Sequence, residues 1–236
     1  MLVVLVRPAV RTRSARALRL AGVFGLALGG MNLTFYEALD RIPLGIAVTI
    51  EFAGPLTVAV LTSRRRTDIV WAVLAAAGIV LLSGAGGAGG LDPAGLAFAL
   101  AAAALWGIYI LVAQRASRFY DGSEGVALAM VVAALVPLVP GVAQGGSDLL
   151  RPELLAAGLG VALLSSVIPY SLETEALRRL PAHVFGVLMS LEPAVAALAG
   201  FLVLGQSLGA LDLVAMALVV TASIGVSRLA SAAPEA

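Results

Sequence analysis

The sequence predicts an all-α integral membrane protein with about eight transmembrane helices. Of its 236 residues, 61% are hydrophobic and 12% are charged, whereas soluble domains carry about 25% charged residues because their surfaces face water. A chain with so few charges cannot cover a water-facing surface. Two further observations indicate the same class: long apolar stretches recur along the chain, and the arginines are distributed unevenly between the loops that separate these stretches.

The apolar stretches have the length of membrane spans. A helix needs about 20 mostly apolar residues to cross a bilayer, and a helix satisfies its own backbone hydrogen bonds in lipid. Gly, Pro and charged residues separate the stretches, and the alternating pattern of barrel strands is absent. We expect spans at residues 20–39, 43–62, 69–88, 93–114, 124–143, 154–176, 183–204 and 209–227.

The arginines predict the orientation of these spans. All 15 basic residues are Arg, and 13 of them lie at the N-terminus or in alternate loops, while the other set of loops holds only Arg41 and Arg151. Cytoplasmic loops carry an excess of positive charge. Both termini are therefore predicted to be cytoplasmic, and the run at 64–66 is a topology signal rather than a nucleic-acid patch.

A sequence repeat relates the two halves of the chain. Residues 37–43 (EALDRIP) resemble residues 175–181 (EALRRLP) at an offset of 138, and the same offset places Pro55 on Pro193. The offset equals five spans, and an odd number of spans reverses the orientation of the second copy. The pattern predicts inverted repeats, which are common in secondary transporters.

Six short motifs follow one another along the chain, at residues 31–36, 41–48, 51–55, 169–173, 185–193 and 204–205. Together and in this order they resemble the drug/metabolite transporter superfamily, EamA family, and within it most closely the threonine/homoserine exporters. The resemblance implies ten helices in two inverted five-helix halves, both termini inside, and proton-driven efflux of small amino acids across a bacterial inner membrane.

The chain departs from that pattern in two places. Gln206 stands where many members have Glu, and the first helix and most of the second are missing. Residues 1–90 would form an incomplete first half with three full helices, and residues 91–236 a complete second half. We expect Met1 to be an internal or mis-assigned start, with a genuine eight-helix protein or a partner that supplies the missing spans as alternatives.

Two glutamates in the middle of predicted spans are the first candidates for a transport site. Glu51 precedes Pro55 by one helical turn, and Glu192 directly precedes Pro193. Ionisable groups cost a few kcal/mol within a span and are therefore functional candidates, and prolines break helices at transporter sites. The hypothesis is a proton-coupling or substrate-amine site. The alternative is that each protonated glutamate makes a hydrogen bond between helices.

A polar stripe in the sixth span is a second candidate. Ser166, Tyr170 and Glu173 share one helical face, and Pro169 is predicted to kink the helix there. These residues could line a substrate path. The alternative for Glu173 is a position at the cytoplasmic interface.

Three further side chains are candidates for substrate contact. Asn32 and Tyr36 lie one turn apart in the first span, and the repeat offset places Asn32 on Tyr170. Contact with a substrate hydroxyl or carboxylate is one interpretation, and a hydrogen bond between helices is the other. Trp106 lies too deep in the fourth span for an interface anchor, which favours an aromatic wall of the cavity over that usual role.

The remaining composition limits other functions. The chain has no Cys and one His, His183, so we expect no metal site, no cofactor and no enzyme activity. The expected partners are a small-molecule substrate, protons as coupling ion and the lipid bilayer, with no nucleic acid, and a homodimer is compatible with the sequence. Export of another small metabolite or drug, or a non-functional N-terminally truncated fragment, are the alternative functions.

Overall fold

The computed structural model describes residues 14–62, 68–85, 91–116, 118–120, 124–168, 172 and 188–231. These residues are almost entirely helical, and no strand occurs among them. The elements are α2 (Ala15–Leu39), α3 (Leu44–Glu51), α4 (Ala53–Thr62), α5 (Asp68–Ala85), α6 (Pro93–Ala116), α7 (Glu124–Gly145), the 3₁₀ helix η3 (Gly146–Leu150), α8 (Pro152–Ala162), the π-helical turn η4 (Leu163–Val167), α11 (Glu192–Leu204) and α12 (Ala210–Ser231).

The predicted helical class is confirmed, and each of the eight predicted spans overlaps at least one described helix. Three stretches are long and apolar enough to cross a membrane, namely Ala15–Leu39, Pro93–Ala116 and Glu124–Leu150, and shorter apolar helices cover parts of the other five spans. The second span differs from a simple rod because it forms two helices, α3 and α4. The sixth span changes from α8 into η4, and such π turns re-satisfy backbone groups next to a helix-breaking proline.

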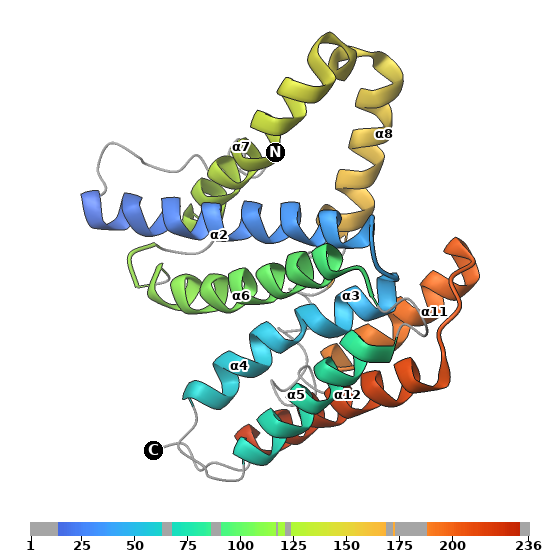
Figure 1. Ribbon diagram of the computed structural model, residues 1–236. Coiled ribbons are helices and arrows are strands. Elements are labelled where there is room, and N and C mark those ends of the chain that lie inside the picture. Colours follow the sequence, from blue (N-terminus) through green and yellow to red (C-terminus); the bar gives the residue numbers. More distant parts are fainter. Residues whose placement is uncertain are drawn as a thin grey trace.

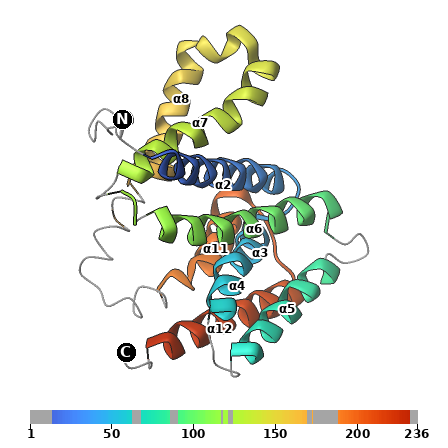
Figure 2. The same ribbon diagram turned by 90° about the vertical axis from the view of Figure 1, so that its left-hand side faces the viewer.

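The helices form two packed groups that share α3 and α6. In Figures 1 and 2, α2 and α6 run side by side, and α7 packs on α2. Below them, α5 packs against α12, and α4 contacts both α6 and this pair. The end of α7, together with η3 and α8, extends away from the rest of the bundle in both views.

Small residues bring α2 and α7 into backbone contact. A Cβ atom added to Gly29 would lie 2.6 Å from the Ala133 carbonyl oxygen, and one added to Gly25 would clash with the Ala129 carbonyl. Both glycines therefore face α7. Such pairs of small residues four apart let membrane helices approach closely.

The most buried element is α3, and residues 45–51 of it are all buried. Its Ile46 and Ile50 pack with Leu82 of α5, Ala99 of α6 and Ala215 of α12. A helix that is apolar on every side is suited to a position surrounded by other helices. The same sequence property therefore places Glu51, the last residue of α3, in the interior.

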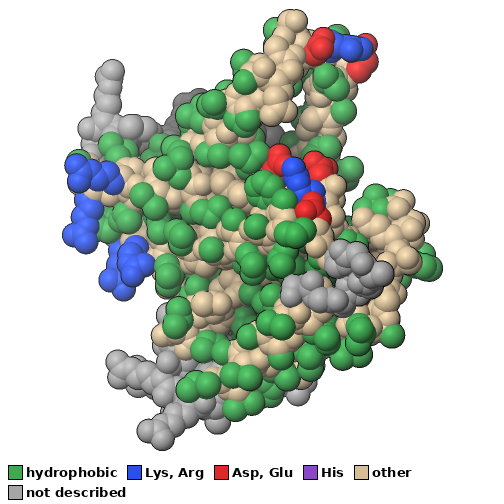
Figure 3. Space-filling model, viewed as in Figure 1, with side chains coloured by type: hydrophobic (Ala, Val, Ile, Leu, Met, Phe, Trp, Pro, Cys, Tyr) green, Lys and Arg blue, Asp and Glu red, His purple; other side chains and the backbone are tan. Residues whose placement is uncertain are grey.

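The outer surface of the described helices is strongly apolar. Large side chains such as Val139, Leu159 and Val203 are more than 60% exposed, and hydrophobic side chains are spread over the face drawn in Figure 3, whereas charged side chains gather at only a few places on it. Soluble monomers rarely expose continuous apolar patches of this extent. With the apolar helix lengths, this surface agrees with a multi-pass membrane protein whose outer side chains face lipid.

Candidate functional site

The second span breaks directly after Glu51. Phe52 separates α3 from α4, although its N–H donates to the Val48 carbonyl at 3.0 Å. Pro55 causes the break because it has no N–H to donate to the Glu51 carbonyl one turn back. The sequence predicted disruption near this proline, and the structure locates it at Phe52.

The side chain of Glu51 is buried at this break, with 8% of its surface exposed. Within the described residues, no group donates a hydrogen bond to its carboxyl group. Thr49, the other buried polar residue of α3, instead donates to the Gly45 carbonyl of its own helix at 2.6 Å. A buried carboxyl group without a donor is costly, and such groups are strong candidates for function in membrane spans.

A second helix break lies beside the first. Ser190 and Leu191 form a turn before α11, and Pro193 occupies the first turn of that helix. Phe52 and Ser190 are related by the repeat offset of 138 residues. Glu192, the first residue of α11, is exposed, and its carboxylate lies close enough to Glu51 for electrostatic repulsion.

Close packing of α3 against α11 brings the two breaks together. A Cβ on Gly45 would lie 2.7 Å from the Ala197 Cα atom, so the two backbones approach each other closely here. At the far end of this contact, Leu44 N–H donates to the Gln206 side-chain oxygen at 3.0 Å. Gln206 thereby satisfies a free donor at the start of α3.

Aromatic and aliphatic side chains cover the break at Phe52. The Phe52 and Trp106 rings meet edge to face, with centroids 5.4 Å apart and planes at 85°. Met189 and Ala196, from the region around the second break, pack in the same cluster. The structure therefore brings Trp106 of α6 next to the break that contains Glu51.

A serine pair is the polar feature that the sequence analysis missed. Ser190 is fully buried, and its Oγ atom lies 2.8 Å from Oγ of Ser223 in α12, so the two hydroxyls share a hydrogen bond. Ser190 stands in the turn before α11, and the repeat offset that pairs it with Phe52 was the signal that could have found it.

The first-span candidates lie on the outside of α2. The Asn32 amide donates to the Leu28 carbonyl of its own helix at 2.9 Å, and its side chain is exposed. Tyr36 is 50% exposed, with its ring centroid 6.2 Å from that of Phe35. The described contacts do not join either residue to Glu51, although Phe35 packs in the cluster that contains Trp106.

Most of the polar stripe in the sixth span lies outside the described residues. This applies to Pro169, Tyr170 and Glu173, and to the side chain of Ser166, whose backbone belongs to η4. Among the described residues, no group of three or more His, Cys, Asp or Glu side chains could hold a metal ion.

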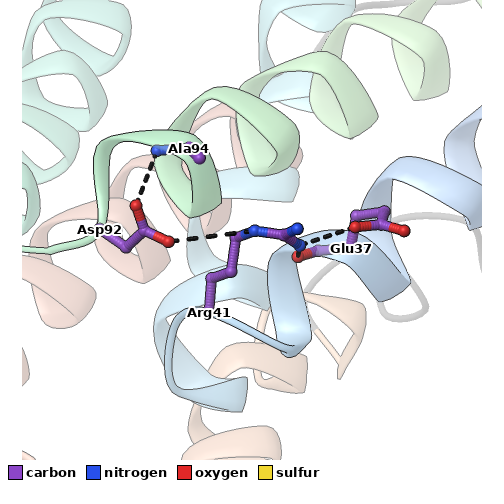
Figure 4. Close-up of polar contacts among 4 residues, drawn as sticks. All are labelled: Glu37, Arg41, Asp92 and Ala94. Carbon is purple, nitrogen blue, oxygen red and sulfur yellow. Dashed lines mark hydrogen bonds and ion pairs between the residues drawn. The ribbon is translucent and has the colours of Figure 1, made fainter.

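An ion-pair network fixes the turn at which α2 ends. Arg41 Nη1 lies 2.7 Å from Glu37 Oε2, and Arg41 Nε lies 4.0 Å from Asp92 Oδ2. Asp92 in turn accepts a hydrogen bond from Ala94 N–H at 3.0 Å (Figure 4). The network connects the end of α2 to the start of α6 through Arg41, one of the two arginines in the loops predicted to be external.

A bundle of apolar helices with a buried carboxyl group that has no hydrogen-bond donor among the described residues, beside two helix breaks, is typical of a membrane transport protein. The model of the EamA-like transporter family matches residues 93–228. The chain belongs to this family, and it is therefore a multi-pass membrane transporter rather than an enzyme.

Proteins of similar sequence support this assignment over most of the chain. The threonine/homoserine exporter RhtA of Escherichia coli (strain K12) is 46% identical over 217 residues, which are 91% of this chain and 73% of that protein. RhtA of Salmonella typhimurium (strain LT2) is 45% identical over the same coverage. One solved crystal structure, 25% identical, superposes with a TM-score of 0.51 over 92% of this chain and 79% of that one.

Proposed function

We propose that this chain exports small amino acids of the threonine/homoserine type by proton-coupled alternating access. The observation that carries the proposal is the Glu51 carboxyl group, which is buried at the Phe52 break without a hydrogen-bond donor among the described residues. The names of the similar exporters supply the substrate class. Residues 1–90 and 91–236 would be the two inverted halves, in a bacterial inner membrane with both termini cytoplasmic.

Glu51 would carry the proton. An ionised carboxylate without a hydrogen-bond donor is far more costly at this depth than a protonated one. A proton that enters from outside therefore stabilises the site when no substrate occupies it. Release of that proton to the cytoplasm restores the carboxylate for the next cycle.

The amino acid would use the same two carboxylates. The Glu51 and Glu192 carboxylates repel each other when both are ionised, and a substrate ammonium group between them would replace this repulsion with two attractions. Proton and substrate therefore compete for one site. This competition couples inward proton movement to outward movement of the amino acid, because either ligand excludes the other.

The aromatic pair would shape the apolar side of the site. Trp106 and Phe52 pack edge to face beside the break, and an apolar wall excludes water and strengthens the electrostatic interactions of the carboxylates. The hydroxyl pair of Ser190 and Ser223 lies at the second break and would offer hydrogen-bonding groups there.

The test compares Glu51→Gln with Glu153→Gln in proteoliposomes. Gln keeps the shape of the side chain but cannot exchange a proton. We expect Glu51→Gln to abolish threonine or homoserine transport driven by a pH gradient, while the protein still inserts and remains monodisperse. Glu153 has a side chain 74% exposed, so the same change there serves as the matched control and is expected to leave transport intact.

Two outcomes would contradict the proposal in different ways. Normal gradient-driven transport by Glu51→Gln would show that Glu51 is a structural residue. If the parent chain moved neither threonine nor homoserine but moved another small metabolite or a drug, the substrate class would be wrong while the coupling argument stood.

A further inference from the structure

Four arginines line one cavity, and none of them belongs to the helices that are broken at Phe52 and Ser190. The cavity has a volume of about 380 Å³ and lies where α2 begins and α6 ends. In Figure 3 the basic side chains gather at the corresponding left-hand edge of the molecule. We call this cavity the arginine pocket; it is lined by Arg16, Arg19, Leu20, Val23, Arg115, Arg118 and Phe119.

The positive charges of the arginine pocket have no described acidic partner. No ion pair joins any of its four guanidinium groups to a carboxylate of the described residues, and the first turn of α2 holds no acidic side chain. Four cations that share one cavity repel each other, and a bound anion would relieve that repulsion. The positive end of the α2 helix dipole adds to the positive potential there.

Two of the arginines are held in place, which pre-forms the pocket. The Arg16 guanidinium lies over the Phe119 ring, 5.6 Å from its centroid. Arg115 donates from Nη1 to the Leu111 carbonyl at 2.9 Å. Each guanidinium keeps further N–H donors free for a ligand, because it has five in a planar fork. That fork matches the oxygens of a phosphate group.

The remaining lining is apolar and runs along α2. Arg16, Leu20 and Val23 share one helical face, and a rise of 1.5 Å per residue puts Val23 about 10 Å further along the axis than Arg16. Val23 and Leu26, the next residue but two, are 45% and 58% exposed. A free anion would use only the guanidinium end, whereas a molecule with an anionic head and an acyl chain would use both parts.

We propose that the arginine pocket binds the phosphate group of an anionic phospholipid, with an acyl chain lying along Leu20 and Val23. Basic pockets between membrane helices on the cytoplasmic side are suited to such headgroups. Arginines that served only to orient the protein in the membrane could lie anywhere in the cytoplasmic loops. Those at the start of α2 and the end of α6 instead line one shared cavity. The site shares no residue with the breaks at Phe52 and Ser190, so this inference is independent of the proposed substrate.

The experiment measures lipid binding to the full chain in detergent by native mass spectrometry, together with its thermal unfolding. The probes are dioleoyl phosphatidylglycerol, dioleoyl phosphatidylcholine and inorganic phosphate. Of the three probes, we expect phosphatidylglycerol to bind at the lowest probe concentration, and only phosphatidylglycerol to raise the unfolding temperature of the protein. If inorganic phosphate had the same effects as phosphatidylglycerol, the site would bind a soluble anion rather than a lipid. If both lipids bound equally well, the charge of the headgroup would not contribute to binding. Either result would overturn the proposal.

The variant Arg19→Gln/Arg118→Gln tests the site itself. These two residues have no described hydrogen bond or ion pair, so their replacement disturbs the fold least. Each arginine near an anionic lipid contributes about 1 kcal/mol, or about fivefold in affinity, so the double variant is expected to bind phosphatidylglycerol about 25-fold more weakly. The matched control Arg151→Gln removes an arginine whose side chain is 61% exposed, outside the pocket, and should bind as the parent does.

The single variants keep the test informative if the double variant does not fold. Arg19→Gln and Arg118→Gln should each weaken binding about fivefold. Parent-like affinity in the folded variants, or the same loss in Arg151→Gln, would refute the arginine pocket as the lipid site.

Discussion

The contact between α2 and α7 allows a controlled test of the packing that supports the bundle. Gly22 and Gly29 lie in the same helix, two turns apart. A Cβ atom added to Gly22 meets nothing within 4 Å, whereas one added to Gly29 lies 2.6 Å from the Ala133 carbonyl oxygen. The variants Gly22→Ala and Gly29→Ala therefore make the same chemical change in open space and in a tight contact.

The size of the effect follows from these distances. Ordinary van der Waals contact begins at 3.4 Å, so Gly29→Ala requires α2 and α7 to separate by the difference between 3.4 and 2.6 Å, about 0.8 Å. A backbone carbonyl cannot rotate out of the way, and overpacking of this kind costs about 1–3 kcal/mol. Both variants gain about 0.5–1 kcal/mol from the better helix propensity of Ala, so that term cancels between them.

The assay is thermal unfolding of the two purified variants in the same detergent. At about 2–4 °C per kcal/mol for a chain of this length, the unfolding temperature of Gly29→Ala should lie about 2–12 °C below that of Gly22→Ala. Equal unfolding temperatures would mean that α7 does not pack on Gly29 as the structure shows, and the position of the α7–α8 hairpin would then be wrong.

Three further predictions concern orientation and the site. Single cysteines introduced as Ser63→Cys and Gly89→Cys into this Cys-free chain should react differently with an impermeant thiol reagent in intact cells, with only Gly89→Cys labelled; the reverse pattern would refute the orientation predicted by the arginines. Gln206→Met leaves the Leu44 N–H without its acceptor and should cost about 1–3 kcal/mol of stability in detergent, and an unchanged unfolding temperature would contradict that contact. Trp106→Leu removes the aromatic wall but keeps an apolar side chain, so it should lower the transport rate of proteoliposomes without reducing insertion, and full activity would exclude Trp106 from the site.

Sequence reasoning found the broken helices but could not show what surrounds them. Pro55 and Pro193 are visible in the sequence, and a proline removes a backbone donor wherever it stands. The break at Phe52, and the shared hydroxyl hydrogen bond of Ser190, depend on neighbouring helices and were not predicted. The role of Asn32 stays a prediction; its amide donates to the Leu28 carbonyl of its own helix, and nothing in the sequence indicated this contact.

Composition and the spacing of the apolar stretches indicated the class of protein and the approximate positions of the spans, and the arginines predict their orientation. These properties depend on composition and on the thickness of a bilayer, which act on each segment separately. Which distant residues meet depends on the tertiary structure. The structure packs α3, which ends at Glu51, against α11, which begins at Glu192, and it brings Arg19 of α2 and Arg118 beyond α6 into one pocket. The physical reason is that these contacts arise from close packing between helices, which no local pattern encodes.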